Sequence, residues 1–131
     1  MKITDLRPML WTKQLKESIE FYESKLQFKC TSYDEEWGWA TLKKDDVHIM
    51  LAFPNEHMKF KQSNFTGSFY FYTKDVESIW RKLKNEVEVC YPLEEFDYGM
   101  KEFGIYDNNG YLLQFGQEIE IPELEDLDFG I

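Results

Sequence analysis

The chain has 131 residues, 18% of them aromatic, and this length predicts a single domain, residues 1–131, with a hydrophobic core of its own. Its formal net charge of −10 argues against nucleic acid as a partner, because phosphate contacts need patches of Lys and Arg. No apolar run reaches the roughly 18 residues that span a bilayer, and the N-terminus lacks the apolar stretch of a signal peptide, so we expect a cytoplasmic protein with no membrane partner.

The first half of the chain predicts one helix and four strands. Ile3 to Thr12 is rich in β-favouring residues and predicts a strand, and the apolar positions from Leu15 to Leu26 follow helical spacing. Alternation and turn residues then predict three more strands, at Phe28–Tyr33, Trp37–Leu42 and Val47–Phe53. The predicted order is β-α-β-β-β, over about residues 3–53.

A polar segment of about residues 54–66 links this module to a second one with the same order, over about residues 67–117. The second module consists of a strand, a helix and three further strands, predicted at Ser68–Thr73, Val76 to about Lys84, Val87–Tyr91, Lys101–Tyr106 and Leu112–Gly116. Residues 118–131 form an acidic tail with six acids and no base, which leaves a net charge of −4 for the rest of the chain.

The two modules repeat one another in sequence. Trp11-Thr12-Lys13-Gln14-Leu15-Lys16-Glu17-Ser18-Ile19 returns as Tyr72-Thr73-Lys74-Asp75-Val76-Glu77-Ser78-Ile79. At the other end, the segment from Lys44 to Leu51 aligns with the segment from Asp107 to Gln114. A repeat of this length predicts two copies of one supersecondary unit, which we expect to pack around a shared cleft.

Three features together resemble the vicinal-oxygen-chelate superfamily, which includes glyoxalase I, extradiol dioxygenases, and fosfomycin- and bleomycin-resistance proteins. They are the paired modules, the helix motif Leu15-x-x-Ser18-Ile19-x-Phe21-Tyr22, and Asp107-x-x-Gly110 before the last strand. The stretch from Tyr98 to Phe103 and the last strand look most like the bleomycin-resistance branch. The resemblance covers most of residues 5–117. It implies an α+β fold whose two curved mixed sheets form a partly open barrel, and a homodimer.

Enzymes of this superfamily hold a divalent metal at four inner positions, early in the first strand and within the last strand of each module. By resemblance these positions fall at Arg7, Leu51, Ser68 and Gln114. None is His, Asp or Glu, Arg7 would repel a cation, and only Gln114 offers a weak oxygen ligand. The sequence therefore predicts no metal, no cofactor and no catalytic residue.

The two histidines leave one alternative open. His48 has the opposite parity to Leu51 and is predicted to face away from the cleft, although a one-residue slip in register reverses this. His57 lies in the linker beside Glu56, where a loop acid could complete a displaced metal site. The alternative function is a metal-dependent lyase or dioxygenase of the glyoxalase type.

Strand alternation predicts which side chains line the cleft. If Arg7 points inward, so do Met9 and Trp11, while Trp37 and Trp39 add stacking surface at the rim. The predicted ligand-binding residues are Arg7, Met9, Trp11, Trp37, Trp39, Ser68, Tyr70, Tyr72 and Gln114. The competing interpretation is that most of these aromatic residues belong to the core.

An acidic protein with an aromatic-lined cleft suits a small organic ligand that is cationic and aromatic, of the bleomycin type. Arg7 would instead favour an anionic or carbonyl-bearing ligand, unless a buried partner such as Glu102 neutralises it. The sequence thus predicts ligand binding without a metal, with antibiotic sequestration as its result. A further alternative is a regulatory module whose acidic tail docks a basic partner.

Overall fold

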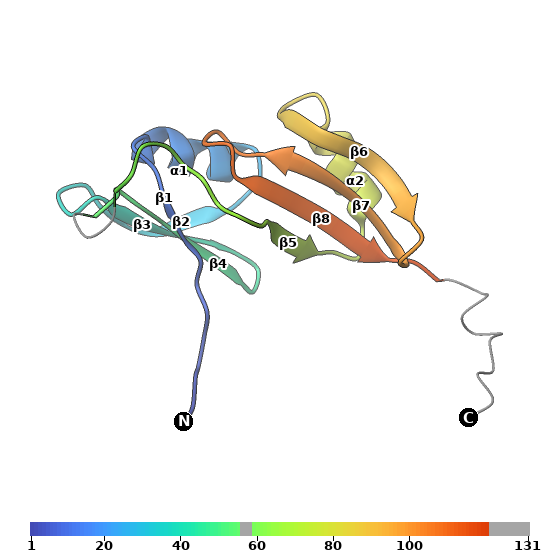
Figure 1. The fold of residues 1–131 in the computed structure, drawn as a ribbon, viewed down its shortest axis with the longest axis horizontal. Coiled ribbons are helices and arrows are strands. Elements are labelled where there is room, and N and C mark those ends of the chain that lie inside the picture. Colours follow the sequence, from blue (N-terminus) through green and yellow to red (C-terminus); the bar gives the residue numbers. More distant parts are fainter. Residues whose placement is uncertain (56–58, 121–131) are drawn as a thin grey trace. The chain divides into compact units, whose positions relative to one another are not determined.

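The computed structural model describes residues 1–55 and 59–120, and the chain divides into two compact units. Unit 1 contains Met1–Thr66 and Asp107–Tyr111, and unit 2 contains Gly67–Tyr106 and Leu112–Ile131. Within the described ranges, each unit holds one four-stranded sheet and one helix in the order β-α-β-β-β (Figure 1). The predicted α+β class with two mixed sheets is therefore confirmed.

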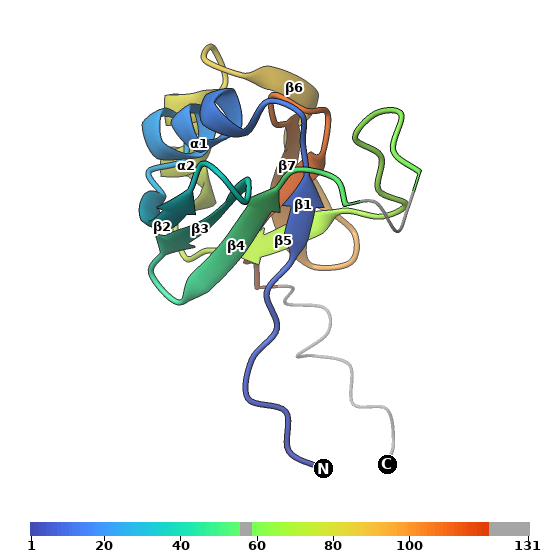
Figure 2. The same cartoon turned by 90° about the vertical axis from the view of Figure 1, so that its left-hand side faces the viewer.

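The sheet of unit 1 has the strand order β1-β4-β3-β2. Figure 2 shows β1 beside β4, and these two strands run parallel, whereas the remaining pairs are antiparallel. Its elements are β1 (Met9–Trp11), α1 (Leu15–Ser24), β2 (Lys29–Asp34), β3 (Trp39–Lys44) and β4 (Val47–Ala52).

Unit 2 repeats this topology with the strand order β5-β8-β7-β6, and β8 lies between β5 and β7 (Figure 1). The β5–β8 pair is parallel and the other two pairs are antiparallel. Its elements are β5 (Phe69–Tyr72), α2 (Val76–Leu83), β6 (Glu88–Phe96), β7 (Met100–Tyr106) and β8 (Leu112–Glu118). Neither α1 nor α2, the helices of the described residues, is long and apolar enough to cross a bilayer.

The core of unit 2 lies between its sheet and α2. Trp80 of α2 packs on Phe103 at a centroid distance of 5.1 Å, and Phe103 stacks on Phe115 at 5.2 Å. Leu113 and Ile105 are fully buried on the same face. Because side chains alternate across a strand, the intervening residues of β7 and β8 point to the opposite face of the sheet.

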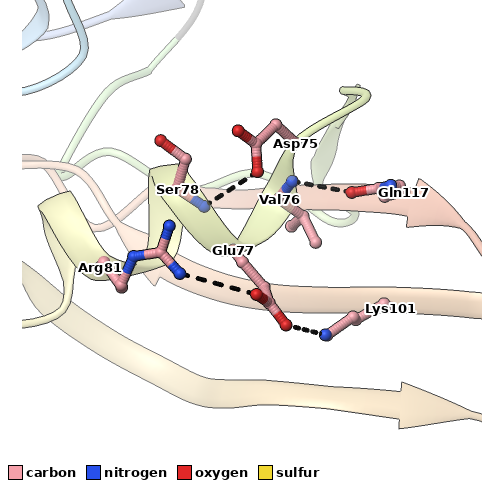
Figure 3. Close-up of polar contacts among 7 residues, drawn as sticks. All are labelled: Asp75, Val76, Glu77, Ser78, Arg81, Lys101 and Gln117. Atoms are coloured by element: carbon pink, nitrogen blue, oxygen red, sulfur yellow. Dashed lines mark hydrogen bonds and ion pairs between the residues drawn. The ribbon is translucent and has the colours of Figure 1, made fainter.

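Polar contacts fix α2 on this core face (Figure 3). The Asp75 carboxylate accepts a hydrogen bond from the Ser78 N–H at 3.3 Å and so caps the helix, and the Val76 N–H donates to Gln117 Oε1 at 2.9 Å. Glu77 pairs with Lys101 on β7. Lys101 and Gln117 share the parity of Phe103 and Phe115, which leaves Glu102, Gln114 and Gly116 on the face without the helix.

The first strand is much shorter than the predicted Ile3–Thr12, since β1 contains only Met9–Trp11. Pro8 lacks an N–H group and can take part in a ladder only through its carbonyl, which accepts a hydrogen bond from Met50 N at 2.8 Å. Arg7 therefore precedes the sheet. Its guanidinium Nε lies 2.7 Å from Asp5 Oδ2 in an ion pair whose side chains are about half exposed.

Strand β6 is longer than the predicted Val87–Tyr91 and continues to Phe96 through a β-bulge. Tyr91 pairs with Gly104 and Glu94 pairs with Glu102, so three steps on β6 match two steps on β7. The irregularity accommodates Pro92, which has no N–H to donate to the ladder. As a result, Tyr91 and Glu94 face the same side of the sheet although their residue numbers differ in parity.

Candidate functional site: a buried carboxylate among tyrosines

Glu102 of β7 is a buried carboxylate, only 2% exposed, on the face of the unit 2 sheet that lacks the helix. Its Oε1 accepts hydrogen bonds from the hydroxyls of Tyr70, at 3.0 Å, and of Tyr98. Its Oε2 accepts from the Tyr91 hydroxyl and from Gln114 Nε2 at 3.3 Å. A buried carboxylate is costly unless such donors replace water, and three hydroxyls and an amide meet that need here.

Two glycines make room for the tyrosines. A Cβ atom at Gly116 would overlap the phenol end of Tyr70, and one at Gly104 would overlap the ring of Tyr91. Both glycines stand in strands and share the face of Glu102, where any larger residue would occupy the space of the rings. Gly104 and Gly116 therefore leave the space beside Glu102 that the rings of Tyr91 and Tyr70 occupy.

Gln114 joins the remaining polar groups into one network. Its Nε2 donates to Tyr91 Oη at 2.7 Å, and its Oε1 accepts from the Ser68 hydroxyl. Because both the nitrogen and the oxygen of the amide are hydrogen-bonded, the orientation of the side chain is fixed. Ser68, Tyr70 and Gln114, three of the predicted ligand-binding residues, therefore belong to the network of Glu102.

The tyrosine hydroxyls of this network act as donors at neutral pH. Burial, and then the hydrogen bond to Glu102, raise the pKa values of Tyr70 and Tyr91. The same hydrogen bond is the main cause that raises the pKa of Tyr98 to about 12. Because a phenol with a raised pKa keeps its proton, these groups can position and donate but are poor bases.

A cavity of about 310 Å³ opens beside Glu102. Phe96 and Tyr98 stack at a centroid distance of 5.4 Å with an interplanar angle of 9°, and Tyr91 meets Phe96 edge-on at 6.0 Å. The cavity has aromatic walls and two carboxylates, and its lining contains no Lys or Arg: Tyr91, Glu94, Phe96, Tyr98, Glu102 and Gln114.

The predicted binding residues of the first module lie in unit 1. Met9, Trp11, Trp37 and Trp39 line an open cavity of about 320 Å³ together with Met50, Ala52 and Phe53. Trp37 precedes β3 instead of belonging to the predicted strand Trp37–Leu42, and it is 77% exposed. Arg7 is paired with Asp5 and is absent from this lining.

Tyr72 of unit 2 meets the Glu102 network at the ring of Tyr70. Its ring meets that of Tyr70 edge-on at 5.3 Å, and the residue is 72% exposed. It lines a separate cavity of about 350 Å³ with Gly116 and Gln117. The predicted ligand set thus falls into two groups, one in each unit, and the shared cleft that would join them stays a prediction.

The assignment of Leu51 to an inner position was wrong by one residue. Strand pairing aligns Trp11 with Ala52 in unit 1 and Tyr72 with Gly116 in unit 2, so the counterpart of Gln114 is Met50. Leu51 is fully buried beside Leu10 and Ala40. His48 shares the parity of Met50, and the prediction that it faces the opposite side from the inner position was also wrong.

The corrected positions do not fit a divalent metal. Arg7 is a cation, Met50 offers only a soft thioether, and Ser68 and Gln114 are hydrogen-bonded to one another. Among residues 1–55 and 59–120, no three His, Cys, Asp or Glu side chains group as ligands could. His57 and Glu56, which the displaced-site alternative invoked, lie outside the described residues.

Five residues of the site were missed by sequence reasoning: Tyr91, Glu94, Phe96, Tyr98 and Glu102. One signal in the sequence could have indicated the site. Glu102 is a single acid next to the apolar run Phe103-Gly104-Ile105, and alternation places it on the same face of the strand as Gly104. From the sequence, Glu102 was predicted only as a partner for Arg7. The structure instead gives Arg7 the partner Asp5, and Glu102 its tyrosine donors.

Gly116→Ala should lower the free energy of unfolding by about 1–3 kcal/mol, because the added methyl group forces Tyr70 out of its place. Urea denaturation measures the change. In a Tyr70→Ala background the same substitution should cost much less, since the obstructing ring is gone. An equal cost in both backgrounds would contradict the proposed packing of Tyr70 over Gly116.

Solved structures with the same fold share little sequence with this chain. A glyoxalase/bleomycin resistance protein/dioxygenase from Nocardioides matches with a TM-score of 0.77 at 17% identity, covering 92% of this chain and 86% of that one. A lactoylglutathione lyase from Agrobacterium tumefaciens matches with a TM-score of 0.69 at 16% identity, covering 87% and 92%. These likenesses establish the fold.

A superfamily member from Sphaerobacter thermophilus also matches, with a TM-score of 0.76 at 15% identity over 88% of this chain and 98% of that one. Comparison with curated proteins gives no match. The family model described as "Glyoxalase/Bleomycin resistance protein/Dioxygenase superfamily" matches residues 6–115. The chain therefore belongs to this superfamily, as the sequence motifs predicted.

Proposed function

We propose that this protein binds a small organic ligand at the Glu102 site of unit 2 and does so without a metal ion. The observation that carries the proposal is the network itself, in which a buried carboxylate and several hydroxyls converge on a cavity with aromatic walls. Aromatic walls with a few fixed polar groups are typical of sites for organic ligands.

The donor chemistry favours binding over metal catalysis. Both oxygens of Glu102 already accept hydrogen bonds from tyrosine hydroxyls, and the amide of Gln114 is committed at both ends. A metal would have to displace these donors and so break the hydrogen bonds that hold the tyrosine hydroxyls and the buried Glu102 together. Sequestration of an antibiotic is the form of binding that we propose, since the family description includes bleomycin-resistance proteins.

The test combines metal analysis with ligand titration on the full chain. Protein purified without chelators should contain less than a tenth of an equivalent of metal, and Zn²⁺, Ni²⁺ or Mn²⁺ should shift its melting temperature by no more than about a degree. Metal-free bleomycin, titrated in EDTA, is the first ligand probe. Stoichiometric metal with a stabilisation of several degrees would favour the metal-dependent lyase or dioxygenase and contradict the proposal.

A matched pair of variants locates the binding. Tyr91→Phe removes a hydroxyl that connects Glu102 with Gln114 and should weaken ligand binding. Tyr33→Phe removes a hydroxyl from β2 of unit 1 and should leave binding unchanged. Equal effects of the two substitutions would place the ligand elsewhere.

A further inference from the structure

Two carboxylates face each other across neighbouring strands of unit 2. Glu94 of β6 and Glu102 of β7 are cross-strand partners, and both line the 310 Å³ cavity. Like charges directly opposite one another destabilise a sheet. Glu77 of unit 2 forms ion pairs with Lys101 and Arg81, whereas among the described residues neither Glu94 nor Glu102 takes part in an ion pair.

The walls of the cavity add a second reason to expect a cation. Tyr91, Phe96 and Tyr98 line this open cavity, and the faces of aromatic rings attract positive charge. The hydroxyls of Tyr91 and Tyr98 are held by Glu102, so these rings are fixed in place. The rings and the two carboxylates form a cage that is open to solvent on one side, with Glu102 buried and Glu94 and Tyr98 exposed, and its hydrogen bonds are in place before the ligand arrives.

Competing ligand classes fit the cavity less well. An anion would meet two carboxylates and no basic side chain in the lining. A divalent metal needs several free oxygen or nitrogen ligands, whereas the oxygens of Glu102 are occupied by hydroxyl donors. A primary ammonium would have to compete with those hydroxyls for the same oxygens, since its three N–H groups require acceptors.

We propose that the cavity between Glu94 and Glu102 binds a methylated organic ammonium group, tertiary or quaternary, by charge neutralisation and contact with the rings of Tyr91, Phe96 and Tyr98. Such a group carries its charge on a large, weakly hydrated surface and needs few or no hydrogen bonds of its own. The inference rests on the proposed function and names the chemical group of the ligand that this site selects. A cavity of this size suits a head group, with the remainder of the ligand outside it.

The test is an NMR titration of the full chain with tetramethylammonium and choline, compared with the neutral isostere 3,3-dimethylbutan-1-ol. The two cations should shift amide signals of residues 91–102 and bind about tenfold more tightly than the neutral alcohol. Raising the salt concentration should lower the affinity for the two cations and leave the affinity for the alcohol unchanged. Equal affinity of cations and alcohol would overturn the proposal.

Two neighbouring glutamates provide a matched pair of variants. Glu94→Gln should weaken tetramethylammonium binding by about tenfold, because it removes one carboxylate from the cavity. Glu95→Gln makes the same change of charge one residue further along β6, at a position paired with Lys101 and outside the cavity lining, and should change the affinity less than twofold. Similar losses in both variants would show long-range attraction only and contradict the cage.

The outcomes separate this inference from the proposed function. If neutral aromatic ligands shift signals of the Glu102 site while tetramethylammonium does not, the choice of an ammonium group is wrong and the proposed binding site stands. If no probe of either class shifts those signals, both proposals fail. Tyr98→Leu should lower the affinity for the two cations more than the affinity for the alcohol, and equal losses would contradict the cage.

Discussion

Replacing Asp107 with Ala should lower the free energy of unfolding by about 3 kcal/mol, because this buried carboxylate of unit 1 holds three hydrogen bonds. Its Oδ2 accepts from the Tyr22 hydroxyl at 2.7 Å, and its Oδ1 accepts from the N–H groups of Asn109 and Tyr111 at 2.8 and 2.9 Å. Asp107 is 4% exposed and Tyr22 is fully buried, so water cannot replace the lost acceptor. Urea denaturation of the full chain measures the effect.

Asp107→Asn is the matched control for this substitution. Its amide oxygen can still accept from the two N–H groups, and the Tyr22 hydroxyl can accept from its NH₂ group, so the loss should be about 1 kcal/mol or less. Tyr22→Phe should cost about 2 kcal/mol, since it leaves Oδ2 of Asp107 buried without a donor. Equal stability of the Ala and Asn variants would contradict the structural role of the carboxylate.

The stability of Asp107→Asn and of the natural protein should depend differently on pH. Burial raises the pKa of Asp107 above its ordinary value of 3.8, and this outweighs the hydrogen bonds that lower it. The folded state therefore holds the proton to a higher pH than the unfolded chain does, and the contribution of Asp107 to stability falls as the pH rises above 3.8. Asp107→Asn lacks this loss, so its stability relative to the natural protein should improve between pH 4 and pH 7.

The order of elements could be predicted because local patterns determine it. The apolar spacing between Leu15 and Leu26 and the helix signal after Val76 predicted α1 and α2, and alternation located the remaining strands. The open face of unit 2 was predictable in part: the family resemblance placed Ser68 and Gln114 at inner positions, and alternation along the first strand of the module added Tyr70.

The cavity at Glu102 could not be predicted in the same way, because it depends on a bulge. Simple alternation places Tyr91 and Glu94 on opposite faces of β6, whereas the irregularity at Pro92 brings both to the cavity. A bulge in one strand is defined by its pairing with the neighbouring strand, and a single sequence does not contain that pairing. The convergence of three tyrosines on one acid is therefore a property of the folded sheet.

The error at Leu51 has a different origin, in the unequal lengths of two turns. Two residues, Asp45 and Asp46, connect β3 and β4, whereas residues 107–111 connect β7 and β8. Aligning the repeat across turns of different length shifted the last strand by one position. Because the side-chain period of a strand is two, that shift exchanged the buried face for the open one.

A pair of substitutions in β4 tests the corrected register with a large expected difference. Leu51→Ala should lower the free energy of unfolding by about 3 kcal/mol, because Leu51 is fully buried and its truncation leaves a cavity in the core. Met50→Ala should cost about 1 kcal/mol or less, because Met50 is only partly buried and lines an open cavity. Chemical denaturation of both variants under the same conditions gives the comparison.

The reverse order of the two effects would restore the register first predicted from the repeat and place Leu51 on the open face. That result would also return His48 to the core face, because the two residues differ in parity. The expected order instead leaves the open face of β4 with His48 and Met50, one nitrogen ligand and one soft thioether two residues apart. A divalent metal requires more than this pair, so the register that the two variants measure also bears on the metal-free mode of binding.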